Sequence, residues 1–142
     1  MGQINFTRVL LGTLIAGVLM FIGDGLLHGM VLKQSWTDAF AALGRKETGE
    51  SGGGMIHFAL YDLLKAFGAI WIYAAIRPRF SPGPRTALHA GVIAWALTLP
   101  IALIGTIPMK YYPVSHVVIW SVVGLVPMAI ATVAGAAVYR EE

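Results

Sequence analysis

Ionisable side chains inside otherwise apolar runs are the residues of this sequence that are best suited to chemistry. Their carboxylate, imidazole and ammonium groups exchange protons and bind ions or small polar ligands. Within a membrane span each charged group costs ~2.5–3.5 kcal/mol at the centre, so such a residue is a functional candidate by default. Six of them are the candidates here: Asp24, His28, His57, Asp62, Lys65 and His116.

Two pairs among these residues have helical spacing. Asp24 and His28 are four residues apart, so a carboxylate can orient an imidazole there for metal binding or proton transfer. A simple contact on the helix surface is equally consistent with that spacing. Asp62 and Lys65 are three residues apart and can neutralise each other as a buried pair.

The histidines also raise the question of a metal or haem cofactor. His28, His57 and His116 are the candidate metal ligands, although a histidine within one turn of the membrane interface is often only hydrogen-bonded. With nearby methionines they resemble the soft ligands that copper(I) prefers, and haem needs two axial ligands on facing helices. The spacing of the histidines favours neither copper nor haem, so the identity of any cofactor stays open. The methionines are Met30, Met55 and Met109.

The composition indicates an integral membrane protein. Of 142 residues 57% are apolar and 12% are charged, against roughly 25% charged in soluble domains. The mean hydropathy is +0.73, and cysteine is absent. These values exclude disordered chains, coiled coils, collagen and disulfide-stapled modules. The net charge of +3 comes from basic residues beside apolar runs, as in membrane proteins, so nucleic-acid binding is not supported.

Four apolar runs predict four membrane-spanning helices, at about residues 8–32, 55–76, 86–108 and 114–139. Each approaches the ~20 residues that cross the hydrocarbon core, where helix satisfies every backbone polar group. The first run is longer than a signal-peptide core and lacks a cleavage motif, so we expect it to be retained. Pro100 and Pro127 fall inside the last two helices and predict kinks. The predicted fold is one all-α, four-helix transmembrane domain over residues 1–142.

The connections add one short helix. In the loop 33–54, Ser35 is a candidate helix start and Gly44 a stop, and Trp36, Phe40 and Leu43 share one face. This pattern predicts an amphipathic helix at about 35–44 lying on the membrane surface. The loop 77–85 is basic and proline-rich, and the five-residue connection 109–113 makes its two helices antiparallel neighbours.

Basic residues predict the orientation. With four crossings both termini and the loop 77–85 lie on one side of the membrane, which carries five arginines, against four basic residues on the other. The bias towards the arginine side predicts both termini in the cytoplasm of a bacterial cell, in the inner membrane. The two sets are Arg8, Arg77, Arg79, Arg85 and Arg140, and Lys33, Arg45, Lys46 and Lys110.

Helical phase groups the polar residues on faces that also carry small residues. Such faces normally meet other helices, so we expect the polar side chains to face the bundle interior, on the side of the long loop. The predicted pocket consists of Asp24, His28, His57, Tyr61, Asp62, Lys65 and His116. The predicted helix-packing glycines, the first two of which could instead serve a dimer, are Gly25, Gly29, Gly91, Gly105, Gly124 and Gly135.

The segment Phe21–Trp36 resembles an uncharacterised family of small bacterial four-helix membrane proteins, a domain of unknown function. The similarity rests on a glycine–aromatic pattern and extends to the long first loop and the short third connection. It departs at Leu27–His28, where that family usually has Trp-Tyr. The resemblance implies the topology and no activity. Its residues are Gly23, Gly25, Leu32, Trp36, Gly44 and Trp95.

Two functions of different class are consistent with these observations. The first is a non-enzymatic membrane protein whose polar pocket binds or passes a small ligand, a proton or a metal ion. The second is a structural or accessory subunit, joined through its glycine faces to a partner membrane protein or to copies of itself. An intramembrane enzyme is a third, less supported interpretation, because the chain has no catalytic signature motif.

Overall fold

The computed structural model describes residues 3–45 and 52–140. This part of the chain is helical and contains no strand. Four stretches are long and apolar enough to cross a membrane, as predicted: Phe6–Val31, Gly54–Phe80, Pro84–Ile104 and Val114–Ala136. The elements in chain order are α1 (Phe6–Leu26), the π-helix η1 (Leu27–Val31), α2 (Lys33–Ala42), α3 (Gly52–Phe80), α4 (Pro84–Thr98), α5 (Pro100–Ile104), α6 (Val114–Val123) and α7 (Leu125–Ala136).

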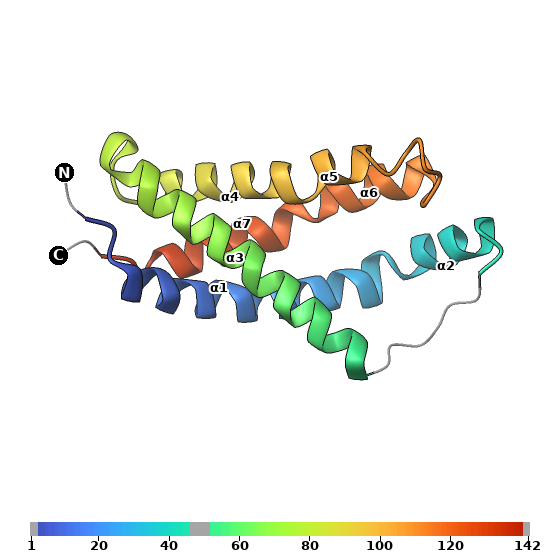
Figure 1. Ribbon diagram of the computed structural model, residues 1–142, viewed down its shortest axis with the longest axis horizontal. Coiled ribbons are helices and arrows are strands. Elements are labelled where there is room, and N and C mark those ends of the chain that lie inside the picture. The colour runs from blue at the N-terminus through green and yellow to red at the C-terminus, as the bar shows by residue number, and fades with distance from the viewer. Residues whose placement is uncertain (1–2, 46–51, 141–142) are drawn as a thin grey trace.

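The bundle is closed at the end where the chain termini lie and more open at the other end (Figure 1). In the closed half α1 contacts α3 and α7, and α4 contacts the same two helices, so the four form a ring. The core of this half is built from small residues such as Ala16, Ala66 and Ala131, all 0% exposed. Small side chains allow the close helix approach that stabilises membrane bundles.

The outer faces of the helices are apolar. Leu14, Val18 and Ile22 of α1 are each more than half exposed, and every spanning helix carries large exposed apolar side chains of the same kind. A soluble bundle would place polar residues on such faces. The four helices are therefore compatible with a multi-pass membrane protein whose outer surface meets lipid chains.

Two of the spanning helices are broken near their middle. α4 gives way to α5 at Leu99, just before Pro100, and α6 gives way to α7 at Gly124, three residues before Pro127. Proline lacks the backbone N–H and its ring clashes with the preceding turn, so the predicted kinks take the form of full breaks. The breaks are adjacent, since a side chain at Gly124 would meet the Leu99 side chain.

Some predicted helix ends require correction. α3 continues through Pro78 to Phe80 instead of ending at Ile76, because a proline in the last turn removes only one hydrogen bond near an end that is already frayed. The first span ends in a π-helix, which the sequence pattern did not indicate.

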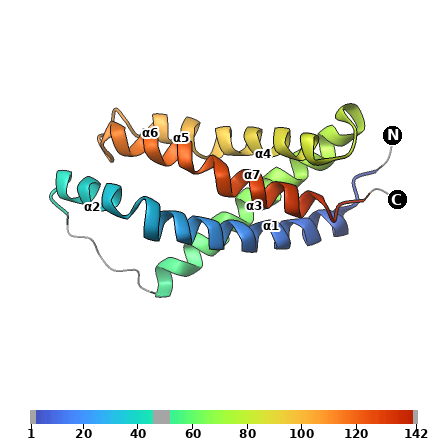
Figure 2. The ribbon, with the colours of Figure 1, turned by 180° about the vertical axis from the view of Figure 1, so that it is seen from behind.

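A short helix, α2, is present close to the predicted place, although it begins at Lys33 and not at Ser35, and its amphipathic character stays a prediction. Gly44 follows it with a φ of 64°, the left-handed conformation that glycine favours. In both views α2 follows α1 and lies beside α6 (Figures 1 and 2), and the two helices are in contact. Its position on the membrane surface stays a prediction. Residues 46–51, which include Lys46 and most of the glycine-rich part of the loop, lie outside the described residues.

Candidate functional site

Three charged side chains form a cluster between α1 and α3. The Lys65 ammonium lies 2.6 Å from the Asp24 carboxylate and 2.8 Å from the Asp62 carboxylate. The side chains of Lys65, Asp24 and Asp62 are 10%, 18% and 4% exposed respectively. Asp62 lies eight residues from the start of its span at Gly54, roughly 12 Å along the helix. One ammonium thus bridges two carboxylates well inside a membrane-spanning segment.

The crossing of α1 and α3 positions this cluster. A side chain at Gly17 would come within 2.9 Å of Leu63, so glycine allows the two helices to meet here. Helical side chains lean towards the N-terminus of their own helix, so Lys65 extends past this crossing towards Asp24. Beyond it the N-terminal half of α3 leaves the bundle (Figure 1). The cluster therefore lies where the closed half of the bundle ends.

Tyr61 connects the cluster to a helix break. The Lys65 ammonium lies 4.7 Å from the centre of the Tyr61 ring, in a cation–π contact. The Tyr61 hydroxyl donates a hydrogen bond of 3.2 Å to the carbonyl of Thr98, the last residue of α4. A break leaves carbonyl groups without their usual helical donors, and a polar side chain can satisfy them.

At the second break, between α6 and α7, a side chain likewise donates a hydrogen bond to a backbone carbonyl. The Trp95 indole donates a hydrogen bond of 2.8 Å to the carbonyl of Ser121, in the last turn of α6. Pro127 of α7 packs close to Gly23, the residue before Asp24. The charged cluster and the broken segments consequently belong to one layer of the bundle.

A second polar cluster lies near the long loop and consists of histidine and aromatic rings. His28 of η1 accepts a hydrogen bond of 2.8 Å from the Trp36 indole, and the Ser35 hydroxyl lies 2.6 Å from Nδ1 of His116. The Trp36 ring is 4.2 Å from the His116 ring and 5.2 Å from the Trp120 ring, measured between centres. These contacts hold α2 against η1 and α6.

His116 is the most buried member of this aromatic cluster. It is 1% exposed, and its Nε2 has no hydrogen-bond partner within residues 3–45 and 52–140. The rings around it fill the surrounding space, which favours a packing role for the cluster.

The structure thus places the residues of the predicted pocket in two groups. The first group consists of Asp24, Tyr61, Asp62 and Lys65, and the second contains His28 and His116. His57 is exposed on the half of α3 that diverges from the bundle. The hydrogen bonds of Asp24 and His28 lead to different helices, because Lys65 reaches Asp24 from α3 and Trp36 reaches His28 from α2. The Asp62–Lys65 pair is present and has Asp24 as a third member.

The described residues contain no group of three or more histidine and acidic side chains placed to hold a metal ion. Of the candidate ligands, His28 and His116 contact the same two tryptophans. The question of a copper or haem cofactor, which the sequence left open, therefore stays open.

Three of the predicted packing glycines lie against another helix. A side chain at Gly91 would come within 3.1 Å of Thr132 on α7, and Gly124 lies against Leu99. Gly135 faces Gly12 of α1, backbone to backbone. Gly12 was not predicted, although it precedes the small residues Ala16 and Gly17 of the same buried face.

The other predicted packing glycines do not contact another helix. Within residues 3–45 and 52–140, Gly25 and Gly29 have no atom within 4 Å of an added side-chain carbon, and Gly105 meets only a carbonyl of its own turn. Gly25 lies on the side of α1 opposite the buried stripe of Val9, Ala16 and Met20, so packing inside the bundle was the wrong expectation for it.

Side-chain chemistry thus concentrates at the charged cluster, where two carboxylates and one ammonium carry a formal charge of −1 when all are ionised. The aromatic cluster and the glycine contacts build the frame around it. A comparison of the chain with protein-family models, with curated proteins and with solved structures finds no match.

Proposed function

We propose that this protein takes up and releases a proton inside the membrane, at the cluster of Asp24, Lys65 and Asp62. The observation that carries the proposal is the single ammonium between two carboxylates. With all three groups ionised the cluster keeps one uncompensated negative charge. Apolar surroundings disfavour a net charge, and one added proton removes it.

A proton suits this geometry better than a metal ion does. A divalent ion needs four to eight ligands, whereas a proton needs one carboxylate oxygen and a hydrogen-bond acceptor. The two carboxylates converge on Lys65, whose ammonium occupies the space that a metal ion would take. Intramembrane carboxylates of this kind mark proton relays in pumps and transporters.

The two carboxylates differ in their access to the surroundings. The Asp24 side chain is 18% exposed and that of Asp62 is 4% exposed, while Tyr61 beside them is 42% exposed. We propose that Asp24 exchanges the proton with the open half of the bundle and that Lys65 shifts between the two carboxylates as either is protonated. The two helix breaks lie at the level of the cluster, and one of them accepts the hydrogen bond from Tyr61. At such a break the two halves of a helix can change their angle to each other.

Infrared spectroscopy of the protein in lipid bilayers tests the proposal. We expect a carboxyl C=O stretch, the signature of a protonated Asp or Glu, to grow as the pH falls, and Asp62→Asn to remove it. Proton flux into protein-containing vesicles should fall by at least about tenfold in the same variant, because the relay loses its buried member. The matched control is Asp38→Asn on α2, whose carboxylate accepts a hydrogen bond from Gln34 at the exposed surface.

Either of two results would overturn the proposal. One is a C=O band that persists in both Asp62→Asn and Asp24→Asn. The other is a flux that Asp62→Asn and Asp38→Asn lower equally.

We further propose that the protein lies in the bacterial inner membrane with both termini in the cytoplasm. The closed end of the bundle, where the termini lie (Figure 1), is also the end of the arginine-rich loop. Arginines next to span ends favour the cytoplasmic side.

The absence of native cysteine allows a direct test of this orientation. In intact spheroplasts a membrane-impermeant maleimide should label Lys110→Cys, and it should label Ser81→Cys only after lysis. Both residues lie in connections between spanning helices. The reverse labelling pattern would place the termini outside.

A further inference from the structure

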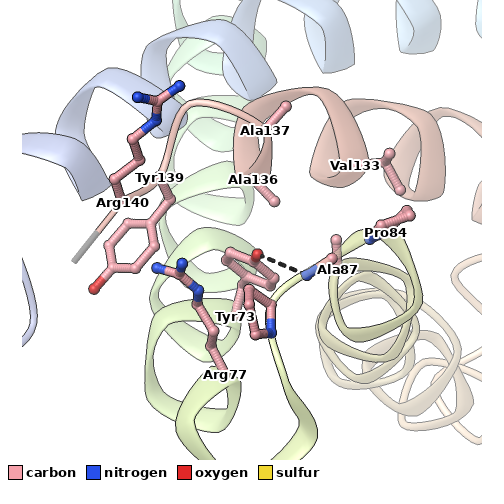
Figure 3. Close-up of a pocket in the computed structure, with 11 residues that line it drawn as sticks. Tyr73, Arg77, Pro84, Ala87, Val133, Ala136, Ala137, Tyr139 and Arg140 are labelled. Atoms are coloured by element: carbon pink, nitrogen blue, oxygen red, sulfur yellow. Dashed lines mark hydrogen bonds between the residues drawn. The ribbon is translucent and has the colours of Figure 1, made fainter. Parts of the chain in front are cut away.

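A cavity of about 490 Å³ lies at the closed end of the bundle, far from the charged cluster (Figure 3). It is bounded by the last turns of α3 and α7, the segment that follows α7, and the first turn of α4. Its polar lining comes from Tyr73, Arg77, Tyr139 and Arg140. From the sequence, Arg77 and Arg140 indicated only the orientation of the protein in the membrane.

The cavity lining has one buried hydrogen-bond donor without an acceptor in the described part of the chain. Nη1 of Arg77 is buried and has no hydrogen-bond partner in the described part of the chain. Its guanidinium lies 5.3 Å from the centre of the Tyr139 ring, between that ring and Tyr73 (Figure 3). The Tyr73 hydroxyl accepts the Gly83 N–H at 3.3 Å, so its own proton remains a donor. Such donors suit an acceptor-rich ligand.

The charged side chains that line the cavity are both positive, within the residues that the structure describes. Arg140 lines the rim of the cavity. The N-terminus of the 15-residue helix α4, which is the positive end of the helix dipole, also borders the cavity, and the first turn of α4 has no acidic residue. The described acidic side chains are Asp24, Asp38 and Asp62, and none of them lines the cavity. The positive charge of Arg77 stabilises the last turn of α3, because it lies near the C-terminus of that helix. In this position Nη1 of Arg77 has no acceptor within the described residues.

We propose that this cavity binds a phosphate group through Arg77 and Tyr73. A planar guanidinium forms charge-assisted, paired hydrogen bonds to phosphate oxygens. Basic cavities between membrane helices at an interface take the head groups of acidic phospholipids. The phosphate belongs either to such a lipid or to a free anion, since both present the same oxygens.

Native mass spectrometry of the purified protein in a non-ionic detergent tests the site. Phosphatidylglycerol and phosphatidylcholine are added in separate titrations, and inorganic phosphate is followed by its effect on the thermal unfolding temperature. We expect one phosphatidylglycerol to be retained at concentrations where phosphatidylcholine is not. Arg77→Gln should weaken that binding by about tenfold or more, the equivalent of one charge-assisted hydrogen bond.

The controls separate binding from folding. Arg79→Gln removes an exposed arginine two residues further along α3, outside the cavity lining, and should bind like the wild type. Tyr73→Phe keeps the ring and should weaken binding less than Arg77→Gln does. Stabilisation by inorganic phosphate without lipid retention assigns the site to a free anion. Equal retention of both lipids without phosphate stabilisation, or equal losses in Arg77→Gln and Arg79→Gln, overturns the proposal.

Discussion

Replacing Lys65 with methionine is expected to destabilise the protein by about 3–5 kcal/mol, enough to unfold much of it in mild detergent. The methionine keeps the length and apolar stem of lysine but removes the ammonium that bridges Asp24 and Asp62 and offsets one of their two charges. Two carboxylates would then face each other without a counter-charge, one of them with a side chain only 4% exposed. Uncompensated buried charge is among the most costly single defects in a folded protein.

A triple variant is the matched control for this prediction. Changing Asp24 and Asp62 to leucine together with Lys65→Met removes every charge of the cluster and keeps the branching of each side chain, although leucine is larger than aspartate. Apolar replacement of a buried ion group is often neutral or stabilising, so the triple variant should recover most or all of the lost stability. The proton-dependent infrared band and the vesicle flux should nevertheless be lost.

Unfolding titrations with sodium dodecyl sulfate, followed by tryptophan fluorescence, measure both variants. A Lys65→Met protein as stable as the wild type would show that the ammonium does not hold the carboxylates together. A triple variant as unstable as Lys65→Met would show that the loss comes from packing of the lysine stem rather than from charge.

The sequence predicted the four spans because their length and hydropathy follow directly from the thickness and the solvent properties of a bilayer. It also indicated the breaks, since Pro100 and Pro127 cannot donate to the preceding turn. It indicated the inward side of each helix only in part: Gly91 and Gly135 lie on packing faces as predicted, whereas Gly25 does not. A helix that is apolar on all sides shows little contrast between its faces, so only its polar and small residues indicate which face is buried.

The candidate site was likewise only partly predictable from the sequence. Helical spacing correctly paired Asp62 with Lys65, because both partners lie on α3. The partners of Asp24 and His28 come from other helices, which no spacing within one helix reveals. The bond from Tyr61 to the Thr98 carbonyl depends on how α3 and α4 pack, so no residue pattern could have predicted it.

Gly135→Leu is the substitution expected to damage the helix packing most. At this position a side-chain carbon would lie 2.5 Å from the carbonyl oxygen of Gly12 and 2.9 Å from both Ala16 and Ile70. The nearest atom belongs to a backbone, which cannot move without displacing α1 from α7. Overpacking of this kind costs about 1–3 kcal/mol for small intrusions, and leucine should exceed the upper value.

Gly25→Leu on α1 provides the matched control, because the added side chain meets nothing within 4 Å. Replacing a helical glycine also gains up to about 1 kcal/mol of helix propensity, so this variant should be as stable as the wild type or more so. Detergent unfolding and cross-linking between α1 and α7, through cysteines introduced beside the contact, report the two outcomes. Equal stability of the two leucine variants would mean that α1 and α7 do not meet at their glycines. A loss confined to Gly135→Leu would show that α1 and α7 pack through their glycines, in one of the contacts that form the ring of α1, α3, α4 and α7.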